Sequence, residues 1–128
     1  LPKPTAFPAF GPAPKAYRIR RLRSLNAQAA VLEEIWLDGD QASQLSTSEL
    51  SHSLYLYYRN VLKLWITEAE DQLGLEPVPQ WAPDGFEPTP GTPCLFAARL
   101  SRSQTGETVE YSQNWIDTNV ARYVARIK

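Results

Sequence analysis

Apolar and polar residues alternate along residues 17–25, and this pattern predicts a β-strand with one mostly apolar face. Tyr17, Ile19 and Leu25 share that face. Arg21 and Arg23 share it too, because alternate residues of a strand point to the same side. The apolar residues make this face the better candidate for the interior. Since a buried charge without a partner is costly, we expect both guanidinium groups to have an acidic partner.

The next alternating run, residues 29–37, supplies that partner. Glu33 lies on the same predicted face as Val31 and Ile35, so it is an acid on an otherwise apolar stripe. A short turn at residues 26–27 would join the two runs as a hairpin. Two inward arginines and a glutamate then form a polar floor in an apolar cavity, which suits a small anionic ligand. A purely structural ion-pair network between the strands is the alternative interpretation.

The remaining pattern predicts an α+β domain with an antiparallel sheet and flanking helices. Apolar residues recur at helical spacing from Leu54 to Lys63, with Ser51 or Ser53 as the N-cap. A short helical turn is expected near residues 46–48, and at most one turn of helix in the proline-rich residues 76–90. Further strands are expected at residues 64–75, 94–101 and 108–116, and a tail at 117–128 with Tyr123 and Ile127 inward.

The first residues form a separate segment. Five prolines within residues 1–14 predict an extended linker or arm, so the expected organisation is an arm at 1–16 and a domain at 17–128. The chain has no methionine and begins with Leu1, and we therefore expect it to be a fragment of a longer protein.

Composition excludes several classes of function. The net charge of −1 does not favour a chain that coats nucleic acid, and no apolar run approaches the length of a membrane span. One cysteine, Cys94, excludes an internal disulfide and a multi-cysteine metal site, and a reducing, cytoplasmic compartment is the simplest interpretation. One histidine, His52, does not support a zinc site or a His-Cys or His-Ser catalytic system. We therefore expect no metal and no cofactor.

A set of short motifs, in order, resembles a known family. The motifs are Arg21-Leu22-Arg23, Glu33, Ser53-Leu54-Tyr55, Gly91-Thr92-Pro93-Cys94-Leu95 and Gly106-Glu107-Thr108-Val109-Glu110-Tyr111-Ser112. Together they resemble the UTRA domain, the effector-binding half of HutC-type GntR-family transcription regulators. The resemblance covers about residues 17–123 and implies a fold like that of chorismate lyase.

The resemblance also implies a function without catalysis. Such domains bind a small metabolite, and a separate N-terminal winged helix-turn-helix, absent from this chain, binds operator DNA as part of a homodimer. Family pockets use residues that correspond here to Arg21, Arg23, Glu33, Ser53, Tyr55 and Glu110, so these are the expected contacts to a small anionic effector. Arginine suits a carboxylate or phosphate because its guanidinium is a planar fork of donors.

The chain departs from the family pattern at its end. Ile116 occupies the position where an aromatic hydroxyl is expected, and the usual arginine-glycine-aspartate tail is missing. Two other functions stay open at this point. One is a chorismate lyase-like enzyme acting on a small carboxylate, by analogy of fold. The other is an interaction module that uses the proline-rich arm and Trp81.

Overall fold

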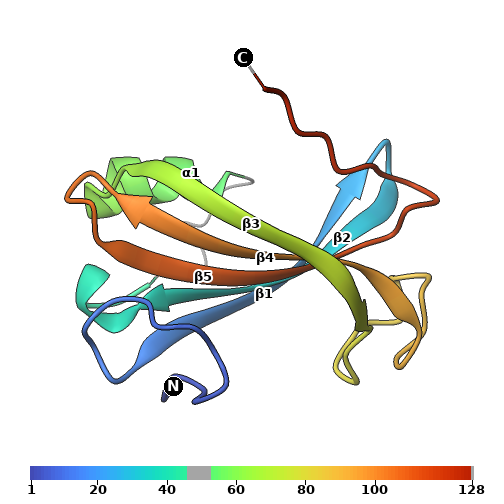
Figure 1. The fold of residues 1–128 in the computed structure, drawn as a ribbon, viewed down its shortest axis with the longest axis horizontal. Coiled ribbons are helices and arrows are strands. Elements are labelled where there is room, and N and C mark those ends of the chain that lie inside the picture. The colour runs from blue at the N-terminus through green and yellow to red at the C-terminus, as the bar shows by residue number, and fades with distance from the viewer. Residues whose placement is uncertain (46–52, 128) are drawn as a thin grey trace. The chain divides into compact units, whose positions relative to one another are not determined.

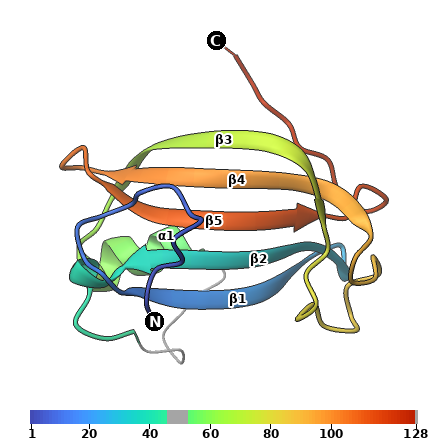
Figure 2. The ribbon, with the colours of Figure 1, turned by 60° about the horizontal axis from the view of Figure 1, so that its bottom comes forward.

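Five strands form one sheet within residues 1–45 and 53–127, the part of the chain that the computed structural model describes. Their order is β1-β2-β5-β4-β3, which makes β1 and β3 the edge strands (Figures 1 and 2). The antiparallel sheet with few helices confirms the predicted α+β class. The strands are β1 (Ala16–Leu25), β2 (Gln28–Asp38), β3 (Ile66–Pro77), β4 (Pro93–Ser103) and β5 (Thr108–Ile116).

Both hairpins have turns of the geometry that their sequences indicate. Asn26 and Ala27, between β1 and β2, have φ angles of 52° and 65°. Two successive residues with positive φ match the right-handed twist of paired strands, as tight hairpin turns require. Gly106, with φ of 82°, lies in the turn between β4 and β5. This region of φ is open to glycine at no steric cost.

The predicted helix begins where its N-cap indicates. Ser53 precedes α1 (Leu54–Tyr57), and its hydroxyl accepts a hydrogen bond from the Leu56 backbone nitrogen at 3.3 Å. The chain continues as a π-helical turn, η2 (Tyr58–Leu62), and ends at Lys63, whose φ is 55°. The wider turn was not predicted. A single 3-10 turn, η1 (Gly39–Gln41), follows β2. In the described residues, no helix has the length and apolar character to cross a membrane.

The chain divides into two compact units, each with its own core. Unit 1 comprises Leu1–Ile19, Ile35–Asp71 and Arg99–Ser112, and unit 2 comprises Arg20–Glu34, Gln72–Ala98 and Gln113–Lys128. The buried core of unit 1 contains Ile35, Leu37, Leu54, Tyr57, Tyr58, Leu64 and Val109. The buried core of unit 2 contains Leu32, Val78, Phe86, Cys94, Phe96 and Trp115. Helix α1 thus buries its apolar face in unit 1, and the proline-rich segment contributes two core residues to unit 2.

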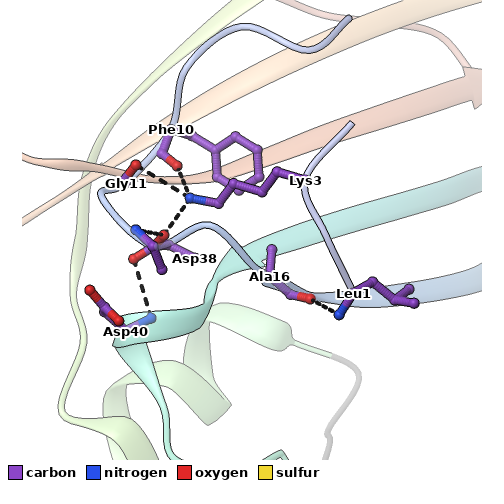
Figure 3. Close-up of polar contacts among 8 residues, drawn as sticks. Leu1, Lys3, Phe10, Gly11, Ala16, Asp38 and Asp40 are labelled. Carbon is purple, nitrogen blue, oxygen red and sulfur yellow. Dashed lines mark hydrogen bonds and ion pairs between the residues drawn. The ribbon is translucent and has the colours of Figure 1, made fainter. Parts of the chain in front are cut away.

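The segment expected to be a linker, residues 1–16, packs within unit 1. Phe10 is only 2% exposed. The ring of Phe7 lies 5.5 Å from Trp36 and 4.8 Å from Tyr111, measured between ring centroids. The backbone nitrogen of Leu1 donates to the Ala16 carbonyl at 3.0 Å (Figure 3). Aromatic burial and backbone pairing therefore hold this segment against the strands of its unit.

An ion pair with a buried aspartate fixes the same segment. Lys3 Nζ lies 2.5 Å from Asp38 Oδ1 and also donates to the carbonyls of Phe10 and Gly11 (Figure 3). Asp38 is 0% exposed. Its carboxylate accepts two further hydrogen bonds, from the backbone nitrogens of Ala13 and Asp40. The buried Asp38 carboxylate is thus stabilised by one ammonium group and two backbone N–H donors, as a buried charge requires.

Some features expected from the sequence differ from the structure, and others fall on residues that the structure does not describe. Residues 76–90 contain hydrogen-bonded turns, such as Phe86 N to Pro83 O at 3.0 Å, in place of a helical turn. The expectation that Ile127 points inward is wrong, because 97% of it is exposed. The helical turn expected near residues 46–48, and His52, lie outside the described residues.

Candidate functional site

Arg21 and Glu33 form the predicted pair in unit 2. Arg21 Nε donates to Glu33 Oε1 at 2.7 Å, and the side chains are 23% and 12% exposed. The adjacent residues pair in the same way on the alternate positions, with Arg20 Nε 2.8 Å from Glu34 Oε2. The guanidinium of Arg20 also lies 4.2 Å from the ring centroid of Trp81. The hairpin therefore carries two ion pairs, of which only the first belongs to the predicted site.

Arg23 does not face the interior as expected. The last three residues of β1, from Arg23 to Leu25, are all exposed, and Leu25 is 48% exposed. β1 is an edge strand, so its end near the turn has a neighbouring strand on one side only. The prediction of two inward guanidinium groups is therefore wrong for Arg23. Arg21 is half-buried.

Glu110 is the centre of a buried hydroxyl network in unit 1. The residue is 2% exposed. Its Oε2 accepts from the Tyr58 hydroxyl at 2.6 Å, and its Oε1 accepts from the Ser101 hydroxyl at 2.9 Å. Both donors are themselves 0% exposed. Hydrogen bonds to a carboxylate are among the stronger ones in proteins, so this network orients both hydroxyl groups.

Tyr55 extends the network. Its hydroxyl lies 3.2 Å from Ser101 Oγ. A serine hydroxyl has one proton, and that of Ser101 goes to Glu110, so the Tyr55 hydroxyl donates to Ser101. Tyr55 is 37% exposed. Burial of the rest of its ring, with the negative charge of Glu110, raises the pKa of its hydroxyl.

Arg99 lies at the other side of Tyr55. Its guanidinium is held by Asp71 through two hydrogen bonds, Nε to Oδ1 at 2.7 Å and Nη2 to Oδ2 at 2.9 Å. The hydrogen bonds to Asp71 raise the pKa of Arg99 above its ordinary value, and its interaction with Tyr55 adds to this. A bidentate pair of this kind fixes the plane of the guanidinium. Asp71 thus positions Arg99 beside the Tyr55 hydroxyl.

Replacing Tyr55 with Phe is expected to make the free energy of unfolding fall less steeply as the pH rises above about 8. Because the folded-state pKa is raised above 10.0, Tyr55 stabilises the fold fully below about pH 10, and this contribution is lost as pH rises through the folded pKa. The free energy of unfolding, measured with urea from about pH 8 to 11, should fall more steeply in the wild type. Tyr123→Phe, in the tail, is the control, and parallel curves for Tyr55→Phe and the wild type would contradict the prediction.

The six predicted site residues are divided between the two units. Arg21, Arg23 and Glu33 belong to unit 2, and Ser53, Tyr55 and Glu110 belong to unit 1. The structure joins Arg21 to Glu33 directly, and it joins Tyr55 to Glu110 through Ser101. Ser53 uses its hydroxyl as a helix cap. In the described residues, no three His, Cys, Asp or Glu side chains gather closely enough to hold a metal ion.

The partners of Tyr55 and Glu110 were not predicted from the sequence. Ser101 and Arg99 occupy alternate positions of β4, a strand otherwise rich in apolar residues, and Glu110 lies on β5 across the hairpin. This alternation of polar residues on two paired strands is the signal that could have found them. Tyr58 lies in the helical run predicted from Leu54 to Lys63, and its ring is buried.

Comparisons with known proteins agree on one family. The UTRA domain family matches residues 9–122. The HTH-type transcriptional regulator SmoD of Agrobacterium fabrum (strain C58 / ATCC 33970) is 47% identical over 128 residues, which are 100% of this chain and 55% of that protein. The chain therefore spans about half the length of this curated relative.

Two solved structures show the fold. The ligand-binding domain of a protein described as a GntR-family transcriptional regulator from Bordetella bronchiseptica has a TM-score of 0.78 at 22% identity, covering 88% of this chain and 73% of that chain. A GntR-family transcriptional regulator from Bacillus cereus has a TM-score of 0.70 at 19% identity, covering 88% and 79%. These similarities confirm the expected chorismate lyase-like fold.

Proposed function

Since the chain belongs to the UTRA domain family, we propose that it is the effector-sensing half of a bacterial HutC-type GntR-family transcription regulator. The observation that carries this proposal is the family match over residues 9–122. A curated relative that is 47% identical is an HTH-type transcriptional regulator, and this chain covers 55% of it. Operator DNA would be bound by a separate winged helix-turn-helix domain of the same protein.

The proposed effector is a small anionic metabolite. Arg21 presents a half-buried guanidinium held by Glu33, and the exposed Arg23 follows on the same strand. Two arginines so close together favour a carboxylate or phosphate. We include Ser53, Tyr55 and Glu110 among the proposed effector contacts because they match the family motifs. In unit 1, Glu110 orients Tyr55 through Ser101, so a contact to Tyr55 would depend on this carboxylate.

The proposed mechanism is allosteric and involves no catalysis, metal or cofactor. An effector can shift the regulator between its DNA-bound and free states only if it binds one arrangement of this domain more tightly than another. The protein is proposed to be a cytoplasmic homodimer, because two-fold operators require a paired scaffold. The comparisons do not favour the lyase alternative. Incubation with chorismate should yield no 4-hydroxybenzoate.

Arg23→Ala is expected to abolish effector-induced thermal stabilisation and to leave the fold intact. The side chain is exposed, so its removal should change the free energy of unfolding by less than about 0.5 kcal/mol. A thermal-shift screen of sugar phosphates, phosphonates and histidine-pathway acids identifies the ligand, and the same shift is then measured in the variant. Arg102→Ala, also exposed, is the matched control. An unchanged shift in Arg23→Ala would remove Arg23 from the proposed site, and no shift with any compound would count against anion sensing.

A further inference from the structure

The Tyr55 hydroxyl is the last member of a chain of hydrogen bonds that has a fixed direction. The chain starts at the Glu110 carboxylate, which accepts from the hydroxyl groups of Tyr58 at 2.6 Å and of Ser101 at 2.9 Å. The single proton of Ser101 is therefore used, and its oxygen accepts from Tyr55 at 3.2 Å. The proton of Tyr55 is used in turn. The Tyr55 oxygen can then only accept further hydrogen bonds.

Arg99 supplies hydrogen-bond donors next to this oxygen. A guanidinium has five N–H groups and no acceptor, so Arg99 is the donor in its hydrogen bond with Tyr55. Asp71 accepts from two other N–H groups, one on Nε and one on Nη2. Among the described residues, the remaining two N–H groups of Arg99 have no acceptor. The Arg99 side chain is 40% exposed and Tyr55 is 37% exposed, so a small molecule can contact both.

The charges around Tyr55 do not favour an anionic group at this point of unit 1. The charged groups that act on the Tyr55 hydroxyl are Glu110, which is buried and negative, and Arg99, which is positive. Asp71 offsets the charge of Arg99 through an ion pair of 2.7 Å. One positive and two negative side chains leave a negative sum. A second anion would be repelled, and its oxygens would meet a Tyr55 oxygen that has no proton to give.

We propose that Tyr55 and Arg99 bind a hydroxyl group of the effector, which donates to the Tyr55 oxygen and accepts from Arg99. A hydroxyl group suits both contacts because it carries one proton and two lone pairs. A carboxylate has no proton for Tyr55, and an ammonium group has no lone pair for Arg99. Arg99 is not one of the six residues expected from the family motifs. This inference rests on the proposed function, because it names a chemical group that the anionic effector carries in addition to its charge.

The direction of the chain is set before the effector binds. Glu110 is 2% exposed, and the hydroxyl groups of Tyr58 and Ser101 that donate to it are buried as well. The two hydrogen bonds from Asp71 fix the plane of the Arg99 guanidinium. Little further ordering of Tyr55 and Arg99 is therefore needed on binding, which favours affinity for a ligand of matching chemistry.

The test compares two pairs of phosphates that differ mainly in their hydroxyl groups. Glycerol 3-phosphate is paired with propyl phosphate, and glucose 6-phosphate is paired with cyclohexylmethyl phosphate. Dissociation constants for the 128-residue chain are measured by isothermal titration calorimetry at about pH 8, where phosphate monoesters are dianions. The hydroxylated member of at least one pair should bind about tenfold or more tightly than its counterpart, which leaves polar groups of the protein unpaired.

Tyr55→Phe and Arg99→Gln should each lower this ratio to about threefold or less. Both side chains are partly exposed, and melting curves verify that the variants fold. A purely structural role of either residue would weaken both members of a pair equally and leave the ratio unchanged. Arg102→Gln is the matched control for Arg99→Gln, because Arg102 is exposed on the alternate face of β4, and it should keep the wild-type ratio.

The outcomes separate this subsite from the proposed function. If the thermal-shift screen identifies another hydroxylated anion, the same ratio is measured against its deoxy form. A ratio near one in the wild type, a ratio that survives in either variant, or binding only of anions without a hydroxyl group would overturn the subsite and leave anion sensing standing. If no anion binds, both the subsite and the proposed anion sensing are wrong.

Discussion

Asp38→Ala should lower the free energy of unfolding by about 3–5 kcal/mol, because it leaves a charged partner without its counterion. Asp38 is 0% exposed, and its Oδ1 accepts from both Lys3 Nζ at 2.5 Å and Ala13 N at 3.1 Å. Loss of the carboxylate leaves the Lys3 ammonium and two backbone donors, Ala13 N and Asp40 N, without this acceptor. The N-terminal segment should then be held less firmly, since this carboxylate is one of the groups that join it to the end of β2.

Urea unfolding of Asp38→Ala and of Asp40→Ala measures the effect. Asp40 is exposed, and its backbone nitrogen, which contacts Asp38, is kept in the variant, so its loss should cost less than about 0.5 kcal/mol. Hydrogen exchange of residues 1–14 should rise in the first variant only. A cost below about 1 kcal/mol for Asp38→Ala would show that the buried ion pair does not hold the segment.

A second large loss of stability is expected for Trp115→Ala, about 3–5 kcal/mol. Trp115 is 5% exposed in the core of unit 2. Its ring meets Phe96 and Trp81 edge-to-face, at centroid distances of 5.2 and 5.8 Å. Its Nε1 donates to the Pro77 carbonyl at 3.1 Å, so the truncation also leaves this carbonyl without its indole donor. The proline-rich residues 76–90 should then pack less tightly in unit 2, because Trp81 contacts the ring that is removed.

Trp65→Ala is the matched control for this truncation. Trp65 is 42% exposed, so the same chemical change should create no internal cavity and should cost less than about 1.5 kcal/mol. Both variants are compared by urea unfolding, which is followed by the wavelength of maximum tryptophan fluorescence emission. Equal costs for the two variants would mean that Trp115 does not organise the core of unit 2.

The candidate site could be predicted where local pattern was sufficient. The pair Arg21 and Glu33 followed from alternation on two neighbouring strands, which places each residue on the mostly apolar face of its strand. Arg23 was misplaced because alternation identifies a face and does not tell where along a strand burial ends. Ser101 was missed because its role depends on Glu110, which the chain brings to it across a hairpin.

By itself, the sequence determined the strands, the hairpin turns, a helix start at Ser51 or Ser53, and the family. These depend on backbone preferences and on alternation between neighbouring residues, which are local properties. Only the tertiary structure decided that the N-terminal segment packs on Asp38, and that the buried Glu110 accepts hydrogen bonds from the hydroxyl groups of Tyr58 and Ser101. These outcomes depend on which distant residues meet and how much surface they bury, and no local pattern contains that information.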